Sequence, residues 1–290
     1  MKIRTILFAI LFTVVSGANV FAQNERFRIS LAEWSLNRSI RKGLLTNLDF
    51  PRVTKTVYGL DAVEYVSTLF AGKGEDMSYL TALKDSCTKY GVKSLLIMVD
   101  SEGNLADTSL AARTKAIENH YKWVKAAKFL GCHSIRVNAG GRGTMGQMQA
   151  AAIDALGRLS DYAAGYGINV VVENHGGNSS IAKWLAEIMK VVNKPNCGTL
   201  PDLGNFYEYD RYRGVTELMP YAKGVSGKTV EFDAEGNEIR VDYVKMMKII
   251  ADSKYTGYID VEYEGSKLTE DEGIKATIKL LRKVIEPYNK

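Results

Sequence analysis

The sequence has few cysteines, and their positions do not form a metal-binding or redox motif. Three are present among 290 residues, and none has the CxxC spacing of such motifs. An odd number of cysteines also argues against a framework of disulfide bonds. We therefore expect Cys87, Cys132 and Cys197 to be small buried residues.

Neither sign of charge is in large excess. The chain carries 38 basic and 33 acidic side chains, a net charge of +5, and no run of Lys and Arg is longer than a pair. A nucleic-acid-binding surface normally needs a basic patch or stripe. We therefore expect no nucleic-acid partner.

Long hydrophobic runs are absent except near the N-terminus. The run from Ile6 to Val15 is about half of the roughly 20 residues that a membrane-spanning helix needs. Lys2 and Arg4 precede it, and Val20-Phe21-Ala22 resembles a cleavage site. We predict a cleaved signal peptide over residues 1–22, with an uncleaved anchor as the alternative. The mature protein would be exported, to the periplasm, without stable membrane insertion, and would keep 36 basic and 33 acidic groups.

Apolar strand-like segments alternate with amphipathic helical segments in the rest of the chain. The predicted helices are Ser109–Leu130, Gln147–Tyr166, Ile181–Val192, Asp242–Ser253 and Thr269–Tyr288, and several are followed by a turn glycine: Gly91, Gly131, Gly167 and Gly257. The predicted strands are Arg28–Glu33, Asp61–Val66, Val92–Val99, Ser134–Asn138, Asn169–Glu173, Gly198–Asp202, Ala222–Lys228 and Tyr258–Glu262.

Eight strands in strict alternation with helices predict an α/β fold, a single (β/α)8 TIM barrel over residues 23–290. An open doubly wound sheet is the main alternative. Such a sheet usually has a glycine-rich phosphate turn after its first strand. Here the first strand is followed by Trp34-Ser35-Leu36-Asn37, without a glycine cluster, and no NAD-type cofactor is indicated.

Charged and polar side chains stand at the ends of the predicted strands. In a barrel these ends meet at one rim, where active sites are built. Carboxylates gathered there can bind a divalent cation or transfer protons. The strand-end residues are Glu33, Glu64, Asp100, Arg136, Asn138, Glu173, His175, Asp202, Lys228, Glu262 and Glu264.

Three segments resemble the xylose isomerase-like TIM-barrel family, also called sugar phosphate isomerases/epimerases. They are Val171–His175, Pro201–Asn205 and Gly257–Glu262, and the resemblance extends from about Arg28 to Glu286. In that family a Glu, an Asp, a His and a Glu after strands five to eight bind a metal. The matching residues of this chain are Glu173, Asp202, Ser226 and Glu262.

Ser226 departs from the family pattern, because a hydroxyl is a much poorer divalent ligand than an imidazole. Three outcomes are open. The carboxylates could still hold Mn²⁺ or Mg²⁺, which oxygen ligands favour, with Zn²⁺ as a further option. His175 could replace the missing ligand. The metal could also be lost, with Lys228 supplying positive charge to a substrate oxygen.

The histidine content separates this chain from one branch of the family. The DNA-repair branch builds a multi-zinc cluster from many histidines, whereas this sequence has three. His120 lies in a predicted helix and His133 before a strand, so we expect both to lie away from the rim. One histidine at the rim cannot form such a cluster.

The resemblance implies a sugar isomerase or epimerase in which Glu173 and Glu262 face opposite sides of the substrate as acid/base groups. Proton transfer beside a carbonyl needs a base and an electrophile on the oxygen. The remaining rim residues would bind the carbohydrate: Glu33, Trp34, Glu64, Arg136, Asn138, His175 and Lys228. A free sugar or glycoside is favoured over a phosphorylated one outside the cytoplasm.

Two other functions remain open. A lyase or hydratase acting on a keto-sugar or glycoside would use the same proton abstraction and would tolerate an atypical metal site. A non-catalytic carbohydrate-binding barrel would explain the missing histidine at position 226. The sequence does not decide the oligomeric state, and a homo-oligomer remains open.

Overall fold

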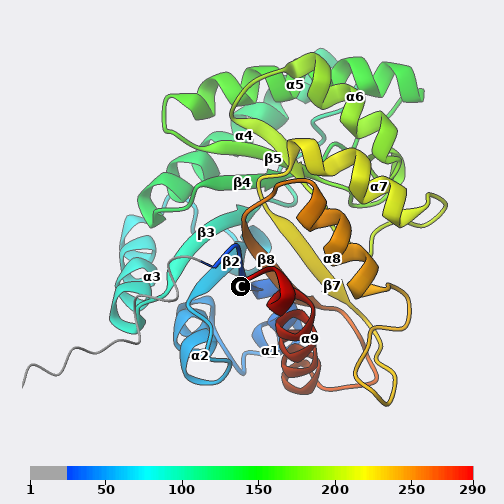
Figure 1. The fold of residues 1–290 in the computed structure, drawn as a ribbon. Coiled ribbons are helices and arrows are strands. Elements are labelled where there is room, and N and C mark those ends of the chain that lie inside the picture. Colours follow the sequence, from blue (N-terminus) through cyan, green and yellow to red (C-terminus); the bar gives the residue numbers. More distant parts are fainter. Residues whose placement is uncertain (1–24, 290) are drawn as a thin grey trace, which may run out of the picture.

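The computed structural model describes residues 25–289, so the predicted signal peptide lies outside the described residues. Eight parallel strands form the centre, and the helices surround them (Figure 1). The strands are β1 Phe27–Ala32, β2 Ala62–Val66, β3 Lys93–Met98, β4 Ser134–Val137, β5 Asn169–Glu173, β6 Cys197–Leu200, β7 Val225–Thr229 and β8 Gly257–Tyr263. The α-helices are α1 Asn37–Arg41, α2 Phe50–Thr56, α3 Met77–Tyr90, α4 Leu110–Leu130, α5 Met145–Ala164, α6 Ala182–Val192, α7 Arg211–Leu218, α8 Tyr243–Asp252 and α9 Glu270–Ile285.

The strand order confirms the predicted barrel. Neighbouring strands run β6-β5-β4-β3-β2-β1-β8-β7, so the first and eighth strands pair directly. The circle closes between β6 and β7 through two isolated parallel bridges, Thr199 with Ala222 and Asp202 with Ser226. All strand ends therefore meet at one rim, as the sequence predicts.

The main apolar core lies between the strands and the surrounding helices, with Trp123 and Phe27 among its largest buried side chains. A second, smaller cluster forms among side chains of several strands, with Trp34 and Leu69 packed against it. Its buried members are Ala32, Val66, Leu96, Met98, Val171 and Leu200.

Two of the predicted glycine stops cap helices directly. Gly91 follows α3 and Gly131 follows α4, and both have the left-handed backbone that favours glycine. The prediction for Gly257 is wrong. Helix α8 ends earlier, Lys254 takes the positive φ of that turn, and Gly257 begins β8.

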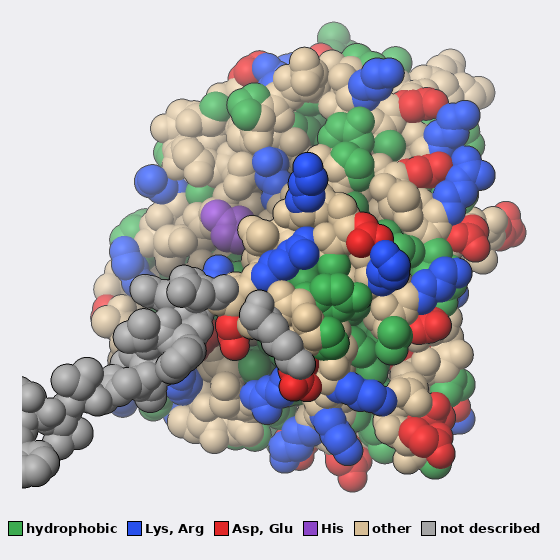
Figure 2. Space-filling view, viewed as in Figure 1, with side chains coloured by type: hydrophobic (Ala, Val, Ile, Leu, Met, Phe, Trp, Pro, Cys, Tyr) green, Lys and Arg blue, Asp and Glu red, His purple; other side chains and the backbone are tan. Residues whose placement is uncertain are grey.

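The three cysteines are free and buried, as expected. Within residues 25–289 no helix has the length and apolar character needed to cross a membrane. On the face shown in Figure 2, basic and acidic side chains are interspersed, as the small net charge suggests.

Candidate active site

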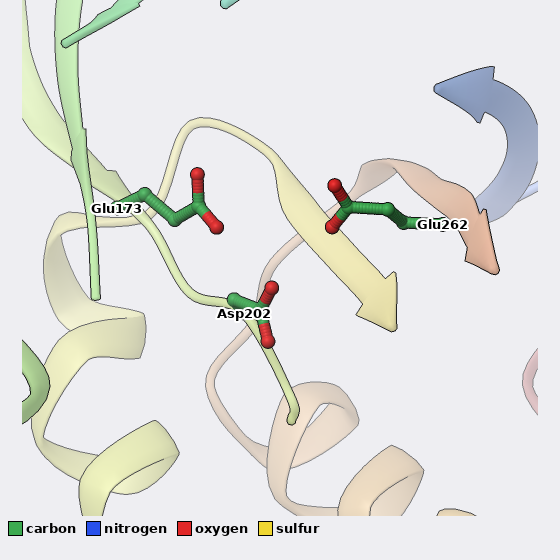
Figure 3. A group of neighbouring side chains, drawn as sticks. All are labelled: Glu173, Asp202 and Glu262. Atoms are coloured by element: carbon green, nitrogen blue, oxygen red, sulfur yellow. The ribbon is translucent and has the colours of Figure 1, made fainter. Parts of the chain in front are cut away.

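Three buried carboxylates converge at the rim of the barrel. Glu173 ends β5, Asp202 follows β6, and Glu262 lies near the end of β8. One oxygen from each lies within 4.8 Å of the others. In Figure 3, Glu173 and Glu262 enter from opposite sides with their carboxylates directed toward each other, and Asp202 lies between and below them. We call these three residues the carboxylate cluster.

The turn after β6 fixes the Asp202 carboxylate. Its Oδ1 accepts hydrogen bonds from the backbone N–H groups of Gly204 and Asn205, at 2.7 and 2.8 Å. Its Oδ2 accepts a bond from the Asn205 side chain at 3.0 Å. Asn174 holds the backbone of Asp202 through two further bonds, at 2.8 and 2.9 Å. The carboxylate is therefore held in one orientation. Burial raises the pKa of Asp202, and these donors oppose that effect.

Arg136 on β4 pairs with the Glu173 carboxylate, with Nε 2.9 Å from Oε2. The other Glu173 oxygen accepts a bond from Asn205 Nδ2 at 3.2 Å. Burial raises the pKa of Glu173; Arg136 opposes this effect, and the nearby Glu262 charge adds to it. Asn205 contacts two members of the cluster and so sets their spacing.

Lys228 and Ser226 on β7 both face the Glu262 carboxylate. The strand register places Lys228 beside Glu262, and Ser226 Oγ donates to Glu262 Oε2 at 2.9 Å. Lys228 Nζ lies 3.2 Å from Asp202 Oδ2 and 3.4 Å from Glu262 Oε2. Burial opposes ionisation of Glu262, but Lys228, Ser226 and Arg136 together lower its pKa. Two buried glutamates in one site thus have pKa values shifted in opposite directions.

A divalent cation fits this donor set. Three carboxylates offer the hard oxygen ligands that Mg²⁺ and Mn²⁺ prefer, and their oxygens are already close together. Two cationic side chains, Arg136 and Lys228, pair with these three carboxylates. The residues that would hold the ion are Glu173, Asp202 and Glu262, with the Ser226 hydroxyl beside them.

His175 does not join the carboxylate cluster. Among residues 25–289, the metal-binding groups that lie within reach of one another are the three carboxylates alone. His175 follows β5 with an exposed side chain, and its backbone N–H is held by Ser179 Oγ. It remains a predicted substrate contact at the rim.

Other predicted binding residues lie beside the cluster. Asn138 and Arg136 both donate to Asp100 Oδ1, each at 2.7 Å, so Asp100 orients this pair. Trp34 Nε1 donates to Glu264 Oε1 at 2.7 Å, and Glu264 Oε2 lies 3.2 Å from Lys228 Nζ. These contacts form one polar network around the carboxylates.

The structure does not bring Glu33 or Glu64 to the cluster. Glu33 is fully buried, and its two oxygens accept bonds from Asn47 Nδ2 and the Val66 N–H, at 2.6 and 2.9 Å. Glu64 lies in the middle of β2, where it accepts a bond from Ser30 Oγ at 2.7 Å. It lines a cavity of about 260 Å³ with residues that precede the strands, at the other end of the barrel.

Sequence reasoning missed Asn205 and Asp260. Asn205 stands three residues after Asp202 in the segment that resembles the family, and that spacing was the available signal. Asp260 precedes Glu262 by two residues and therefore faces the same side of β8. It is fully buried, and burial together with Glu64 and Glu262 raises its pKa.

The model of the xylose isomerase-like TIM barrel family matches residues 56–284, which is well over half of the chain. The chain belongs to the xylose isomerase-like TIM barrel family. The three carboxylates of the cluster lie within reach of one another, and Ser226 contacts one of them, Glu262. No curated protein matches the sequence.

Solved structures share the fold at low sequence identity. An IolI protein with a bound zinc atom is 16% identical, with a TM-score of 0.71 over 90% of this chain and 99% of that one. A 3-keto-D-glucoside 4-epimerase from E. coli is 13% identical, with a TM-score of 0.67 over 88% and 99%. A probable 3-DHS dehydratase from Bacillus anthracis is 19% identical, with a TM-score of 0.63 over 88% and 98%.

Proposed function

We propose that this protein is a sugar isomerase or epimerase that moves a proton at a carbon beside a carbonyl group. The observation that carries the proposal is the placement of Glu173 and Glu262, whose carboxylates face each other across the barrel mouth (Figure 3). Two carboxylates on opposite sides of a substrate can remove a proton from one face and return one to the other.

The neighbouring residues support different roles for the two glutamates, with one as the base and the other as the acid. Lys228 and Ser226 stabilise Glu262 in its charged form, which suits a general base. Glu173, whose pKa is raised by burial, suits the complementary acid. A divalent ion held by the carboxylate cluster would polarise the substrate carbonyl when bound. Mn²⁺ or Mg²⁺ is our first choice, with Zn²⁺ as the alternative.

The substrate we propose is a free sugar or glycoside that carries a carbonyl group, met outside the cytoplasm after export. Support comes from the solved structures, which include a 3-keto-D-glucoside 4-epimerase. Trp34, Arg136, Asn138, His175 and Lys228 lie at the rim or in the network around the carboxylates, where they can contact sugar hydroxyls.

A lyase or hydratase is the second candidate. Lys228 Nζ lies 3.4 Å from Glu262, so an acid stands beside the base and could protonate a departing oxygen. A probable dehydratase among the solved structures has the same fold. Elimination and epimerisation share their first proton transfer and differ in the product.

The test is incubation of ketoses and keto-glycosides with the protein and Mn²⁺ in deuterated water, followed by NMR. We expect deuterium at the carbon beside the carbonyl, together with an epimer. An unsaturated product would select the lyase. Glu173→Gln and Glu262→Gln should each lose exchange by at least about 100-fold, the usual scale for acid–base groups, while remaining folded.

Glu217→Gln is the matched control, because Glu217 pairs with Arg213 on α7 away from the cluster. Exchange that persists in both cluster variants would refute the acid/base roles. Sugar binding without any exchange in the wild-type protein would select the non-catalytic barrel.

A further inference from the structure

Lys228 is held by three carboxylates, two of which belong to the carboxylate cluster. Its ammonium lies 3.2 Å from Asp202, 3.4 Å from Glu262 and 3.2 Å from Glu264. The side chain is only 4% exposed, so these contacts are shielded from solvent. Three carboxylate partners replace the water that the buried ammonium has lost, which favours its charged form.

Two of the carboxylates that Lys228 contacts, Asp202 and Glu262, are also members of the carboxylate cluster that would hold the ion. A divalent ion would be held by the Asp202 and Glu262 carboxylates. The ammonium, which contacts both carboxylates, would then share the buried site with a second positive charge, and the two would repel. The ammonium and the ion would therefore compete for the same two carboxylates.

The third partner of the ammonium, Glu264, lies outside the carboxylate cluster. Glu264 is 33% exposed and lies toward solvent, and Trp34 Nε1 orients its carboxylate from the other side. The stem of Lys228 packs against Gly204, where an added Cβ would lie 3.1 Å from Lys228 Cγ and Cδ. The head of the side chain can therefore turn toward Glu264 while its stem stays in place.

We propose that Lys228 is a built-in competitor for the divalent ion of the proposed isomerase. The ammonium holds Asp202 and Glu262 when no ion is bound, and it shifts onto Glu264 when an ion enters. Ser226, whose hydroxyl donates a hydrogen bond to Glu262, adds no nitrogen ligand that would favour the ion. The protein would consequently bind its metal weakly and exchange it readily.

The test is direct Mn²⁺ binding by isothermal titration calorimetry, which does not depend on turnover. Lys228→Met should lower the Mn²⁺ dissociation constant by about tenfold or more, because the variant removes a positive charge that would repel the ion. Lys267→Met is the matched control, because it removes the same charge from an ion pair with Glu231 after β7. Equal or weaker binding in Lys228→Met than in the control would overturn the proposal.

A second pair of variants keeps Lys228 in place, in case its loss unfolds the protein. Glu264→Gln removes the alternative partner of the ammonium, so Lys228 should compete harder and Mn²⁺ should bind several-fold more weakly. Glu231→Gln removes a carboxylate from the Lys267 pair and should have a smaller effect. Equal affinities in these two variants would also overturn the proposal.

The proposal rests on the proposed function, but the two can fail separately. Tighter Mn²⁺ binding in Lys228→Met without any proton exchange by the wild-type protein would support competition and refute the isomerase. Proton exchange by the wild-type protein, with Mn²⁺ binding no tighter in Lys228→Met, would support the isomerase and refute competition by Lys228.

Discussion

At the scale of single residues, the site is a balance between buried charges of opposite sign. Glu173 pairs with Arg136, while Asp202 and Glu262 pair with Lys228. Such charges are tolerated in a barrel interior only when partners and hydrogen bonds replace the lost water. The residues could be found from strand ends, but their pairing could not, because pairing depends on strand register.

Asn205 offers a test of how closely the carboxylates must be held. Its side chain donates to both Glu173 and Asp202, at 3.2 and 3.0 Å. Replacing it with Ala frees both carboxylates to move apart, so we expect Mn²⁺ affinity or activity to fall by about 10- to 100-fold. Calorimetric titration measures this, with Asn196→Ala, remote from the rim, as the control. Unchanged Mn²⁺ affinity and activity would contradict the positioning role.

Glu33 makes the stability of the protein depend on pH. Burial raises the pKa of Glu33 to about 7, although bonds from Val66 and Asn47 oppose the shift. The folded state therefore binds a proton more tightly than the unfolded chain, whose carboxyl has a pKa of about 4.3. The stabilisation is complete below that unfolded value and is lost as the pH rises through 7.

We expect Glu33→Gln to flatten the pH dependence of the free energy of unfolding. Between about pH 5 and 7 the slope should be smaller by up to roughly 1.4 kcal/mol per pH unit. Urea unfolding at several pH values measures the slope, with the exposed Glu75→Gln as control. Parallel curves for wild type and Glu33→Gln would refute the shifted ionisation.

At the scale of elements, the alternation of strands and helices was predictable, but short helices and exact strand ends were not. Helices α1, α2 and α7 are too short for a clear apolar period, and α3 buries only Leu80, Leu83 and Cys87. Strand β6 was expected to reach Asp202 but ends at Leu200. Pro201 has no N–H to continue the ladder, which explains the early end.

In the barrel wall, the backbone amides of the irregular β6–β7 junction should be the least protected from hydrogen exchange. Three backbone bonds cross it, from Lys223, Ser226 and Leu203, at 2.9 to 3.1 Å. By contrast, β1 and β8 pair over five consecutive positions. Amide exchange requires local opening, which is easier where regular pairing is interrupted.

We expect the junction amides to exchange with deuterium faster than those of β1 and β8. Hydrogen–deuterium exchange followed by mass spectrometry of peptides covering residues 198–228 and 257–263 measures the difference. Slower exchange in the junction peptides would contradict the expectation that the β6–β7 junction opens more easily than the pairing of β1 with β8.

At the scale of the whole molecule, the family and the barrel followed from the sequence because strand order and strand ends recur along the entire chain. The depth of each side chain along the barrel could not be predicted from the sequence. Glu64 and Asp202 were both predicted at strand ends, yet Glu64 lies in the middle of β2 and lines a cavity at the other end. One residue of shift along a strand moves a side chain by about 3.3 Å and to the other face.

The stability of the fold should not depend on reducing conditions. All three cysteines are free and buried, so no disulfide among residues 25–289 contributes to its stability. We expect the midpoint of thermal unfolding to be the same with and without dithiothreitol. A midpoint lowered by several degrees in the reductant would show a disulfide bond in the oxidised protein.

Asn289 and Phe27 hold the two ends of the described chain together. The Asn289 side chain accepts a bond from the Phe27 N–H at 2.8 Å and donates one to its carbonyl at 2.7 Å. Phe27 begins β1, so this clasp lies at the end of the barrel opposite the carboxylates. A short linker could therefore join residues 26 and 289, and new termini could be opened between other repeats. Protein engineering could then choose which of the eight units is translated first, while their order around the barrel and the carboxylate cluster stay as they are.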